Sequence, residues 1–514
     1  MPGAPIQVGP FVGGLNTFSD ATAIADNELT VCENFELDLD GSLKSRPPIE
    51  DLEIDFPLQA TGQMEFLGVF EVSQTVSYLI ASDGIDKTYY FDGSAWVLIT
   101  STIAAAGFTQ FDDKAWLTAP VGSANPGGYW TVSGGFTADS NMPKGNLITS
   151  FKGRLWIAEG QNSTSQGTRL YRSKTLADPS LWVASNDFVD IGSGDGQNIV
   201  QLAVYFNTLL IFRTRSVYGL QYTSDPAAAT VSLVLPSIGL NSRYSITQFE
   251  SIIYFMYDNK AYEFTNNRAA QINVKVPFFS TQTSGFHNDY AVSEFNQRII
   301  FTYFDKMFAY NLRTRSWTTW VSDTYGSLCK IYPRANSEDK SIVLTHSNVN
   351  VPNGGSRSVP LLQITDEYAS ISETMSCKIQ TKNFNYQASS IYKRLFWWGL
   401  DASFKGTVVG TAVPISQSFT TTWQQLFNSE TWNSMLQYTW GSPQSGSPPV
   451  TTSVTESAVT FRRIFVKFLK SLRFRQIYYK VDFTTNGTAS EAPVRLFSLT
   501  TYVNPKQTVS KEIS

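Results

Sequence analysis

The sequence is poor in the side chains from which most metal and redox sites are built. Its 514 residues include three cysteines, Cys32, Cys329 and Cys377, and two histidines, His287 and His346. Two histidines cannot supply a multi-histidine metal site. Three cysteines far apart in the chain do not form a disulfide framework, which indicates folding in a reducing compartment.

Charge and long apolar runs are also scarce. Only 16% of the residues are charged, and the formal net charge is −4. The whole chain is therefore not a polycation that seeks nucleic acid, although a local basic patch is compatible with this balance.

No apolar run approaches the roughly 20 residues of a membrane-spanning helix. The first 14 residues lack the charged segment and apolar core of a signal peptide. We expect no membrane span.

Recognised catalytic motifs are missing as well. The sequence has no Gly-x-Ser-x-Gly, His-Glu-x-x-His, Cys-x-x-Cys or Walker pattern, and the Gly/Asp-rich turn at 192–196 lacks the Gly-Lys-Ser/Thr ending of a phosphate loop. Many aspartates fall at turn positions, where their side chains hydrogen-bond locally: Asp83, Asp92, Asp112, Asp113, Asp258 and Asp305. We expect a protein that is not an enzyme and that uses no cofactor or metal.

Aromatic residues are abundant, at 14%, and they recur in a repeated pattern. Each copy has a leading Phe, two or three polar residues, an apolar strand, a turn and an aromatic strand. The clearest copy, 294–320, predicts strands at 299–303 and 307–311 and a third strand containing Trp317 and Trp320. The leading residues are separated by 41, 40, 55, 43 and 46 positions and are Phe70, Phe111, Phe151, Phe206, Phe249 and Phe295.

Periods of about 40–50 residues with short strands are typical of β-propeller blades. We therefore predict an all-β chain, with a propeller of six or seven blades at 60–370. Strands at 341–345 and 361–364 would belong to the last, degenerate blade. Two unrelated β-sandwiches are the alternative. Residues 1–59 form an N-terminal arm and β entry segment, and 371–514 a C-terminal β-rich domain; together these terminal segments would make a tube or platform domain.

The two terminal segments carry local patterns of their own. Residues 25–34 suggest a short helix, and 35–39 a strand with a solvated acidic face, followed by a hairpin turn at Asp40-Gly41. Near the C-terminus the apolar residues of a basic run are irregularly spaced, so that a short helix competes with a strand. This run is a solvated face or a phosphate-contacting surface, and its candidate residues are Arg462, Arg463, Lys467, Lys470, Arg473 and Arg475.

Two segments resemble a known family. Residues 148–221 contain a Gly-Arg-Leu-Trp step at 153–156, an Asp-Pro-Ser-Leu-Trp loop at 178–182, the turn at 192–196 and a strand pair at 210–218. This order resembles the central region of short-tailed bacteriophage tail-nozzle proteins, also called packaged-DNA stabilisation proteins. The opening, with FVGGLNT at 11–17 and GSLKSRPP at 41–48, is similar to the start of phage virion proteins.

The resemblance implies a homo-hexameric ring at the end of a phage tail, assembled in the host cytoplasm. Such a ring docks on a tail adaptor ring, anchors tail fibres or spikes, closes the channel and passes phage DNA in transient contact. For docking on the adaptor, the N-terminal residues Phe11, Gly13, Gly14 and Leu15 are the candidates. Two other readings remain open: another phage tail-tip or fibre-base subunit, and a glycan-binding or glycan-cleaving propeller with a carboxylate pair.

Overall fold

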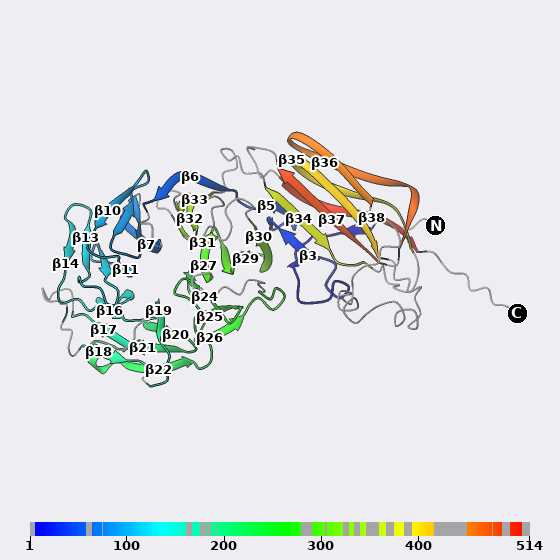
Figure 1. The fold of residues 1–514 in the computed structure, drawn as a ribbon. Helices are drawn as coiled ribbons and strands as arrows, with labels where there is room; N and C mark the ends of the chain where they lie inside the picture. Colours follow the sequence, from blue (N-terminus) through cyan, green and yellow to red (C-terminus); the bar gives the residue numbers. More distant parts are fainter. Residues whose placement is uncertain are drawn as a thin grey trace, which may run out of the picture. The chain divides into compact units, whose positions relative to one another are not determined.

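The computed structural model describes residues 6–57, 64–73, 76–160, 167–174, 182, 187–192, 194–278, 290–303, 306–321, 328–333, 340–345, 359–365, 375–384, 393–415, 450–474, 476–485 and 494–505. Within these ranges the regular structure is β-strand, apart from one 3-10 turn, η1 (Pro226–Ala228). The chain divides into two compact units, both drawn in Figure 1. The propeller unit contains residues 49–309 and 322–366, and the sheet unit contains 1–48, 310–321 and 367–514.

The propeller unit is built from antiparallel meanders, in which each strand pairs with the next one along the chain. Blade 1 is β7 (Glu65–Ser73), β8 (Val76–Ser82), β9 (Thr88–Phe91) and β10 (Trp96–Thr100). Blade 2 is β11 (Gly107–Phe111), β12 (Lys114–Thr118), β13 (Gly128–Thr131) and β14 (Gly135–Ala138). Blade 3 is β15 (Leu147–Phe151), β16 (Arg154–Ala158), β17 (Arg169–Arg172) and β18 (Phe188–Asp190).

The remaining blades follow the same plan. Blade 4 is β19 (Ile199–Tyr205), β20 (Thr208–Arg213), β21 (Val217–Gln221) and β22 (Thr230–Leu235). Blade 5 is β23 (Ile246–Phe249), β24 (Ile252–Tyr257), β25 (Lys260–Thr265) and β26 (Arg268–Gln271). Blade 6 begins with β27 (Tyr290–Phe295), β28 (Arg298–Tyr303) and β29 (Lys306–Asn311). The repeats therefore form the predicted β-propeller.

The seventh blade closes the ring with a strand from the other end of the unit. It is formed by β31 (Leu328–Pro333), β32 (Lys340–Thr345), β33 (Val359–Thr365) and β6 (Ile49–Phe56). β6 pairs antiparallel with β33, with Ile49 opposite Ile364 and Phe56 opposite Val359. The first strand of this blade, β31, contacts the first strand of blade 1. The two ends of the propeller unit are thus joined by backbone hydrogen bonds, not only by side-chain packing.

The leading aromatic residues mark the turns between the first two strands of the blades. Phe111, Phe151, Phe249 and Phe295 each end a first strand. The residues after them have positive φ, as two-residue hairpin turns require: Asp112, Asp113, Lys152, Gly153, Glu250, Asn296 and Gln297. The Asp, Asn and Gly residues there tolerate this conformation well, which is why the polar residues follow the leading residue.

Two of the six copies depart from the predicted alignment. In blade 4 the strand ends at Tyr205, which is 6% exposed, whereas Phe206 lies in the turn with φ 49° and is 69% exposed. Tyr205 is therefore the equivalent of the leading Phe. In blade 1, Phe70 lies inside β7 and pairs with Tyr78, because this hairpin is longer than the others.

The core of the propeller unit lies between successive blades. Leu209 and Ile211 of β20 pack with Trp156 of blade 3, and on the opposite side Leu210 and Phe212 pack with Phe255 of blade 5. Because neighbouring residues of a strand point to opposite faces, a strand buried on both faces is continuously apolar. The sequence TLLIFR of β20, buried at all six positions, shows the result.

One arginine connects blades that are not neighbours. Arg243, just before β23 of blade 5, donates from Nη1 to the carbonyl of Ala106 (2.6 Å), at the start of blade 2. Its Nη2 donates to Oε2 of Glu65 (2.9 Å) and to the hydroxyl of Tyr244 (2.6 Å), and Glu65 begins blade 1. In a seven-blade ring the fifth blade lies opposite the first and second. The Arg243 side chain therefore crosses the centre of the ring.

The sheet unit is assembled from three separate parts of the chain. Its strands are β1 (Ile6–Val8), β2 (Gly14–Leu15), β3 (Glu28–Glu33), β4 (Phe35–Leu37), β5 (Leu43–Ser45), β30 (Ser316–Trp320), β34 (Ser376–Thr381), β35 (Lys393–Ile415), β36 (Val450–Phe474), β37 (Gln476–Thr485) and β38 (Val494–Pro505). The order across the sheet is β30-β3-β34-β37-β35-β38-β5-β4. N-terminal strands therefore lie beside C-terminal ones.

The segments expected from the sequence differ from the compact units chiefly in two places. Residues 49–56, expected in the N-terminal arm, form β6 of the propeller unit, and 310–321, expected in the propeller, belong to the sheet unit. Both follow from hydrogen bonding to strands far away in sequence. Thr319 of β30, for example, is aligned in parallel with Glu33 of β3.

Two local predictions for the N-terminal segment were wrong. The expected helix at 25–34 is strand β3, with Leu29 and Cys32 fully buried. Pairing on both sides, with β30 and β34, outweighs local helix propensity. The expected solvated face of 35–39 is also wrong for Glu36, which is 3% exposed and lies 3.8 Å from Nζ of Lys44. The hairpin turn at Asp40-Gly41 is confirmed, with φ 78° at Gly41.

Candidate binding pocket

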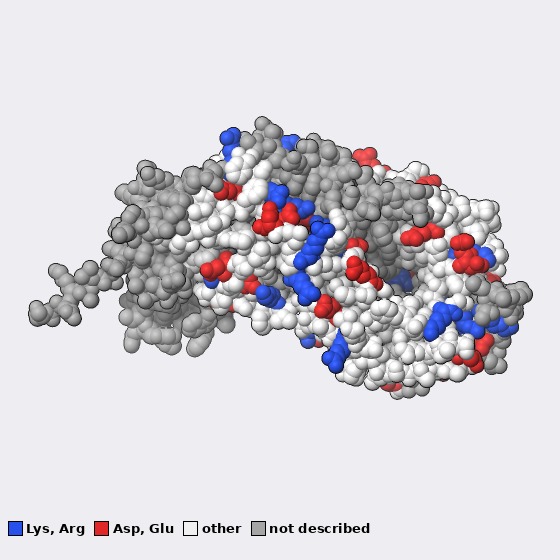
Figure 2. Space-filling model, turned by 180° about the vertical axis from the view of Figure 1, so that it is seen from behind, with Lys and Arg blue, Asp and Glu red and all other residues white. Residues whose placement is uncertain are grey.

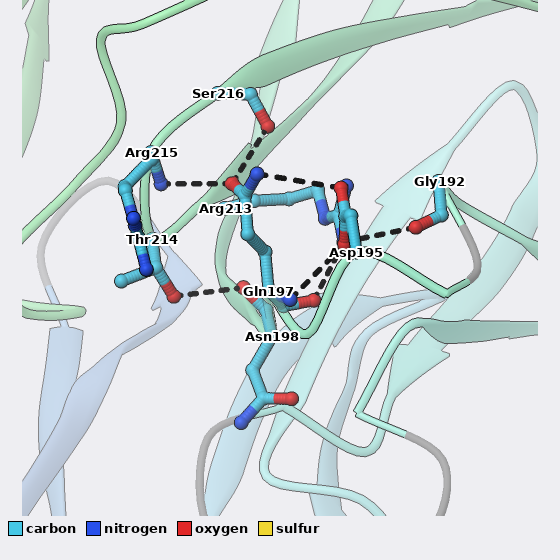
Figure 3. Close-up of polar contacts among 8 residues, drawn as sticks. All are labelled: Gly192, Asp195, Gln197, Asn198, Arg213, Thr214, Arg215 and Ser216. Carbon is cyan, nitrogen blue, oxygen red and sulfur yellow. Dashed lines mark hydrogen bonds and ion pairs between the residues drawn. The ribbon is translucent and has the colours of Figure 1, made fainter.

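A buried arginine organises one corner of blade 4. Arg213 ends the apolar strand β20, and its side chain is fully buried. It faces the loop at 192–198 that leads into β19 (Figure 3). A guanidinium without partners would be strongly destabilising in such a position, so the loop has to supply acceptors.

The loop does so with one carboxylate and two carbonyls. Nη1 of Arg213 donates to Oδ2 of Asp195 (2.7 Å), and Nη2 donates to Oδ1 of the same carboxylate. Nη2 also donates to the carbonyls of Gly192 (3.2 Å) and Gln197 (2.6 Å). The hydrogen bond from Arg213 holds the pKa of Asp195 below its ordinary value. The bidentate ion pair thus fixes the loop on the end of β20.

The loop in turn holds the next three residues of the chain. Oε1 of Gln197 accepts from the backbone N–H of Arg215 (3.0 Å) and from the hydroxyl of Ser216 (3.0 Å). The N–H of Thr214 donates to the carbonyl of Asn198 (3.2 Å). The β20–β21 turn is therefore set by hydrogen bonds to the side chain of Gln197 and to the carbonyl of Asn198 (Figure 3).

This turn lines an open pocket of about 490 Å³ between blades 4 and 5. The lining residues are one arginine, two tyrosines, two apolar side chains and three uncharged polar ones: Arg215, Tyr218, Tyr257, Leu233, Pro236, Gln197, Ser216 and Ser237. Arg215 is exposed, and among the described residues no ion pair to its guanidinium is seen. The nearby carboxylate of Asp195 is already paired with Arg213, which leaves the pocket lining with one positive charge.

Both segments that form this site stand out in the sequence, but the sequence does not show that they are in contact. The turn at 192–196 and the strand pair at 210–218 were noted as separate motifs. An available signal was the arginine directly after the apolar run Leu209–Phe212, because a charged residue at the end of a buried strand needs a partner. The sequence does not indicate which carboxylate pairs with this arginine, because Asp195 and Arg213 lie in separate segments of the chain.

The predicted docking residues of the N-terminal segment are packed into the sheet unit. Phe11 is 0% and Leu15 is 3% exposed. A Cβ on Gly13 would meet the Glu28 side chain, and one on Gly14, whose φ is 64°, would meet Ser316. The two glycines thus allow close packing of β2 against neighbouring chain segments. The side chains of Phe11 and Leu15 are not presented at the surface of this unit.

The basic run lies on β36, so a strand is correct for it and a helix is wrong. Ala402 of β35 pairs with Arg462, Asp401 with Arg463, and Trp397 with Lys467. Register shifts occur opposite 395–397 and 404–406. Such bulges break the two-residue alternation, which explains the irregular spacing of the apolar residues. Lys470 and Arg473 are also within β36, and Arg475 lies outside the described residues.

Most of the aspartates expected at turns have that structural role. Oδ1 of Asp83 accepts three backbone N–H groups, from Ile85, Asp86 and Lys87. Oδ1 of Asp92 accepts from Ser94 and Ala95, and this lowers the pKa of the carboxyl group. Asp112, Asp113 and Asp258 have positive φ in hairpin turns. Asp305 lies outside the described residues.

On the face drawn in Figure 2, acidic and basic side chains are interspersed on a mostly uncharged surface. This agrees with the low charge content of the sequence.

In the part of the chain that the structure describes, no helix is long and apolar enough to cross a membrane.

Comparison with known proteins gives matches among solved structures, all at low sequence identity. No protein-family model and no curated protein sequence matches the chain. Among solved structures, the extracellular domain of a hybrid two-component system from B. thetaiotaomicron is similar over 70% of this chain (9% identity, TM-score 0.42), and this chain spans 43% of that one. The Neurospora crassa Pan2 WD40 domain is similar over 62% of this chain and 95% of its own (10% identity, TM-score 0.40). BamB from Moraxella catarrhalis is similar over 71% and 99%, respectively (10% identity, TM-score 0.36).

Proposed function

We propose that the chain is a structural virion protein, the subunit of a homo-hexameric tail-nozzle ring of a short-tailed bacteriophage. In this role it would extend and close the tail channel, retain packaged DNA and let it pass during ejection. The resemblance of residues 148–221 to that family supports the proposal. This segment corresponds to blade 3 and the first three strands of blade 4.

The observation that carries the proposal is the length of two paired strands in the sheet unit. β35 has 23 residues and β36 has 25, whereas strands of globular proteins usually have 3–10. At about 3.3 Å per residue, β36 would extend roughly 80 Å. β35 pairs along one edge with β36 and along the other with β37 and β38. Long antiparallel walls of this kind suit a static tube element more than a catalytic domain.

The outer edge of β36 suits contact with a second subunit. Among the described strands, β36 pairs with β35 alone. A long strand edge with available N–H and C=O groups is a template for pairing with another chain. A neighbouring copy in a ring could occupy this edge.

An exposed aromatic pair reaches across β35, from the edge strand β36 to β38, and supports the same conclusion. Phe461 of β36 is 56% exposed and Phe497 of β38 is 37% exposed. Their ring centroids are 5.8 Å apart in an edge-to-face arrangement, and the guanidinium of Arg495 lies over the Phe497 ring. Aromatic residues and arginine are both enriched at protein interfaces.

Native mass spectrometry of the purified protein, alone and mixed with its adaptor ring, tests the proposal. We expect a hexamer in solution or on the adaptor. The variant Phe461→Ser/Phe497→Ser should weaken hexamer formation. Phe18→Ser is the matched control, because Phe18 is 68% exposed in the same unit but takes no part in this aromatic pair. A strict monomer that ignores the adaptor would contradict the proposal.

The basic run supplies the proposed contact with DNA. Salt dependence of binding to a DNA duplex measures it, because phosphate contacts release counterions and make affinity fall steeply with salt. Charge reversal at Lys467, Lys470 and Arg473 should reduce both the affinity and this salt dependence. Unchanged binding would assign the run to a solvated face or to an acidic protein partner.

A further inference from the structure

We propose that the pocket between blades 4 and 5 binds a carboxylate-bearing sugar. The proposal rests on this pocket alone and does not depend on ring assembly or on the sheet unit. Its volume, about 490 Å³, lies within the range of roughly 300–1,000 Å³ that is usual for small-molecule sites. One or two sugar rings fit a pocket of this size.

The first reason is the charge of the lining. Arg215 is the charged member of the lining set, and the carboxylate of Asp195 nearby is held by two guanidinium nitrogens of Arg213. The pocket therefore offers one guanidinium to a ligand. A guanidinium recognises a carboxylate with two parallel hydrogen bonds. A phosphate usually binds several cations or a nest of backbone N–H groups, whereas Arg215 is the one cation among the lining residues.

The second reason is the combination of flat apolar surfaces with uncharged polar groups. Tyr218 and Tyr257 provide aromatic rings, and Leu233 is 51% exposed. A sugar ring presents C–H groups that pack on such surfaces and hydroxyls that hydrogen-bond to Ser237 and to amide groups. An inorganic anion would make no use of the aromatic rings, and a purely apolar ligand would make no use of Arg215.

The third reason is that contacts within the protein itself position the groups that line the pocket. Arg213 fixes the loop, and Gln197 of this loop fixes the backbone of Arg215 and the hydroxyl of Ser216. The Arg213 guanidinium also lies 5.5 Å from the centre of the Tyr218 ring. Rigid positioning of the binding groups lowers the entropic cost of association. The ion pair of Arg213 is thus a positioning element, and Arg215 is the group expected to contact the ligand.

Ligand-observed NMR titration of the full chain with glucuronic acid and N-acetylneuraminic acid tests this site. Glucose serves as the neutral sugar and acetate as the bare carboxylate. We expect binding of at least one acidic sugar that is at least about tenfold tighter than binding of glucose or acetate. The variant Arg215→Gln should remove most of this preference, because a charge-assisted hydrogen bond is worth about tenfold or more in affinity.

The matched control is Arg268→Gln, which removes an exposed arginine of blade 5 that does not line the pocket. Its binding should equal that of the unchanged protein. Tyr257→Leu should weaken the acidic sugars while leaving the weak binding of acetate unaltered. Equal affinity for acetate and acidic sugars would overturn the proposal in favour of a bare anion site. Retained binding in Arg215→Gln, or no binding of either acidic sugar, would also overturn it.

Discussion

Replacing Arg243 by methionine tests whether the centre of the propeller is held by a single side chain. The substitution keeps an unbranched apolar stem and removes the guanidinium that donates to Ala106, Glu65 and Tyr244. Burial alone would lower the pKa of Arg243, but the charges of Tyr244 and Glu65 outweigh burial and raise it. The guanidinium is therefore charged at every accessible pH, and its removal should lower the free energy of unfolding over that whole pH range.

The magnitude follows from exposure. Breaking a fully buried ion pair costs about 3–5 kcal/mol, whereas an exposed pair is worth about 0–1 kcal/mol. The side chains of Arg243 and Glu65 are 20% and 37% exposed, so water replaces part of what is lost. We expect Arg243→Met to lower the free energy of unfolding by about 2–4 kcal/mol. Glu65→Gln should cost about 1 kcal/mol, because the amide oxygen still accepts a hydrogen bond.

Urea denaturation of the full chain, followed by tryptophan fluorescence, measures this effect as a lower midpoint of the propeller transition with an unchanged slope. Arg268→Met, at an exposed position of blade 5, is the matched control and should stay within about 0.5 kcal/mol of the unchanged protein. If Arg243→Met behaved like this control, the contacts across the ring would not contribute to its stability, and the reasoning would be refuted.

Three further predictions concern other parts of the chain. Burial, with the neighbouring Cys377 and Glu33, raises the pKa of the Cys32 thiol. Iodoacetamide should therefore leave Cys32 unmodified in the native protein at pH 8 and label it after denaturation, as measured by mass spectrometry. Rapid labelling of the native protein would contradict this burial. Gly406→Ala should destabilise the sheet unit by at least about 2 kcal/mol in thermal unfolding, because φ is 119° and a Cβ would meet the carbonyl of Thr484. Gly153→Ala is the control and should cost less, because Gly153 also has positive φ (70°) but no atom lies within 4 Å of an added Cβ. Because the folded pKa of Asp195 is lowered, its ion pair stabilises the protein above the unfolded aspartate pKa of about 4 and is lost as pH falls through the folded value. The gap in melting temperature between the unchanged protein and Asp195→Asn should therefore shrink below about pH 4, and a constant gap would exclude this linkage.

The strands of the propeller were predictable because their signals are local. The run at 299–303 and the polar turns after the leading residues follow from alternation and turn chemistry, and β28, β29 and β30 confirm the three strands predicted in the clearest repeat. The fourth strand of the last blade was not predictable. The sequence at 49–56 indicates a strand, but nothing in it reveals that its partner lies about 300 residues later.

The candidate site shows the same limit at the level of side chains. Asp195 and Arg213 were visible as a turn residue and a strand end, but their ion pair depends on how the loop returns to the blade. Residues 25–34 were misread because the pairing of β3 with β30 and β34 is non-local. Phe206 was misread for a local reason, since two adjacent aromatic residues competed for one position of the pattern.

The closure of the propeller by β6 has a consequence for synthesis of the chain on the ribosome. β6 ends at Phe56 and its partner begins at Val359, so at roughly 5–20 residues per second β6 waits on the order of 15–60 s before it can pair. Four acidic residues occur within its eight positions, IEDLEIDF, and this charge discourages the waiting strand from joining other unpaired strands. This wait, together with the position of β6 at the outer edge of blade 7, accounts for the acidic residues of the strand.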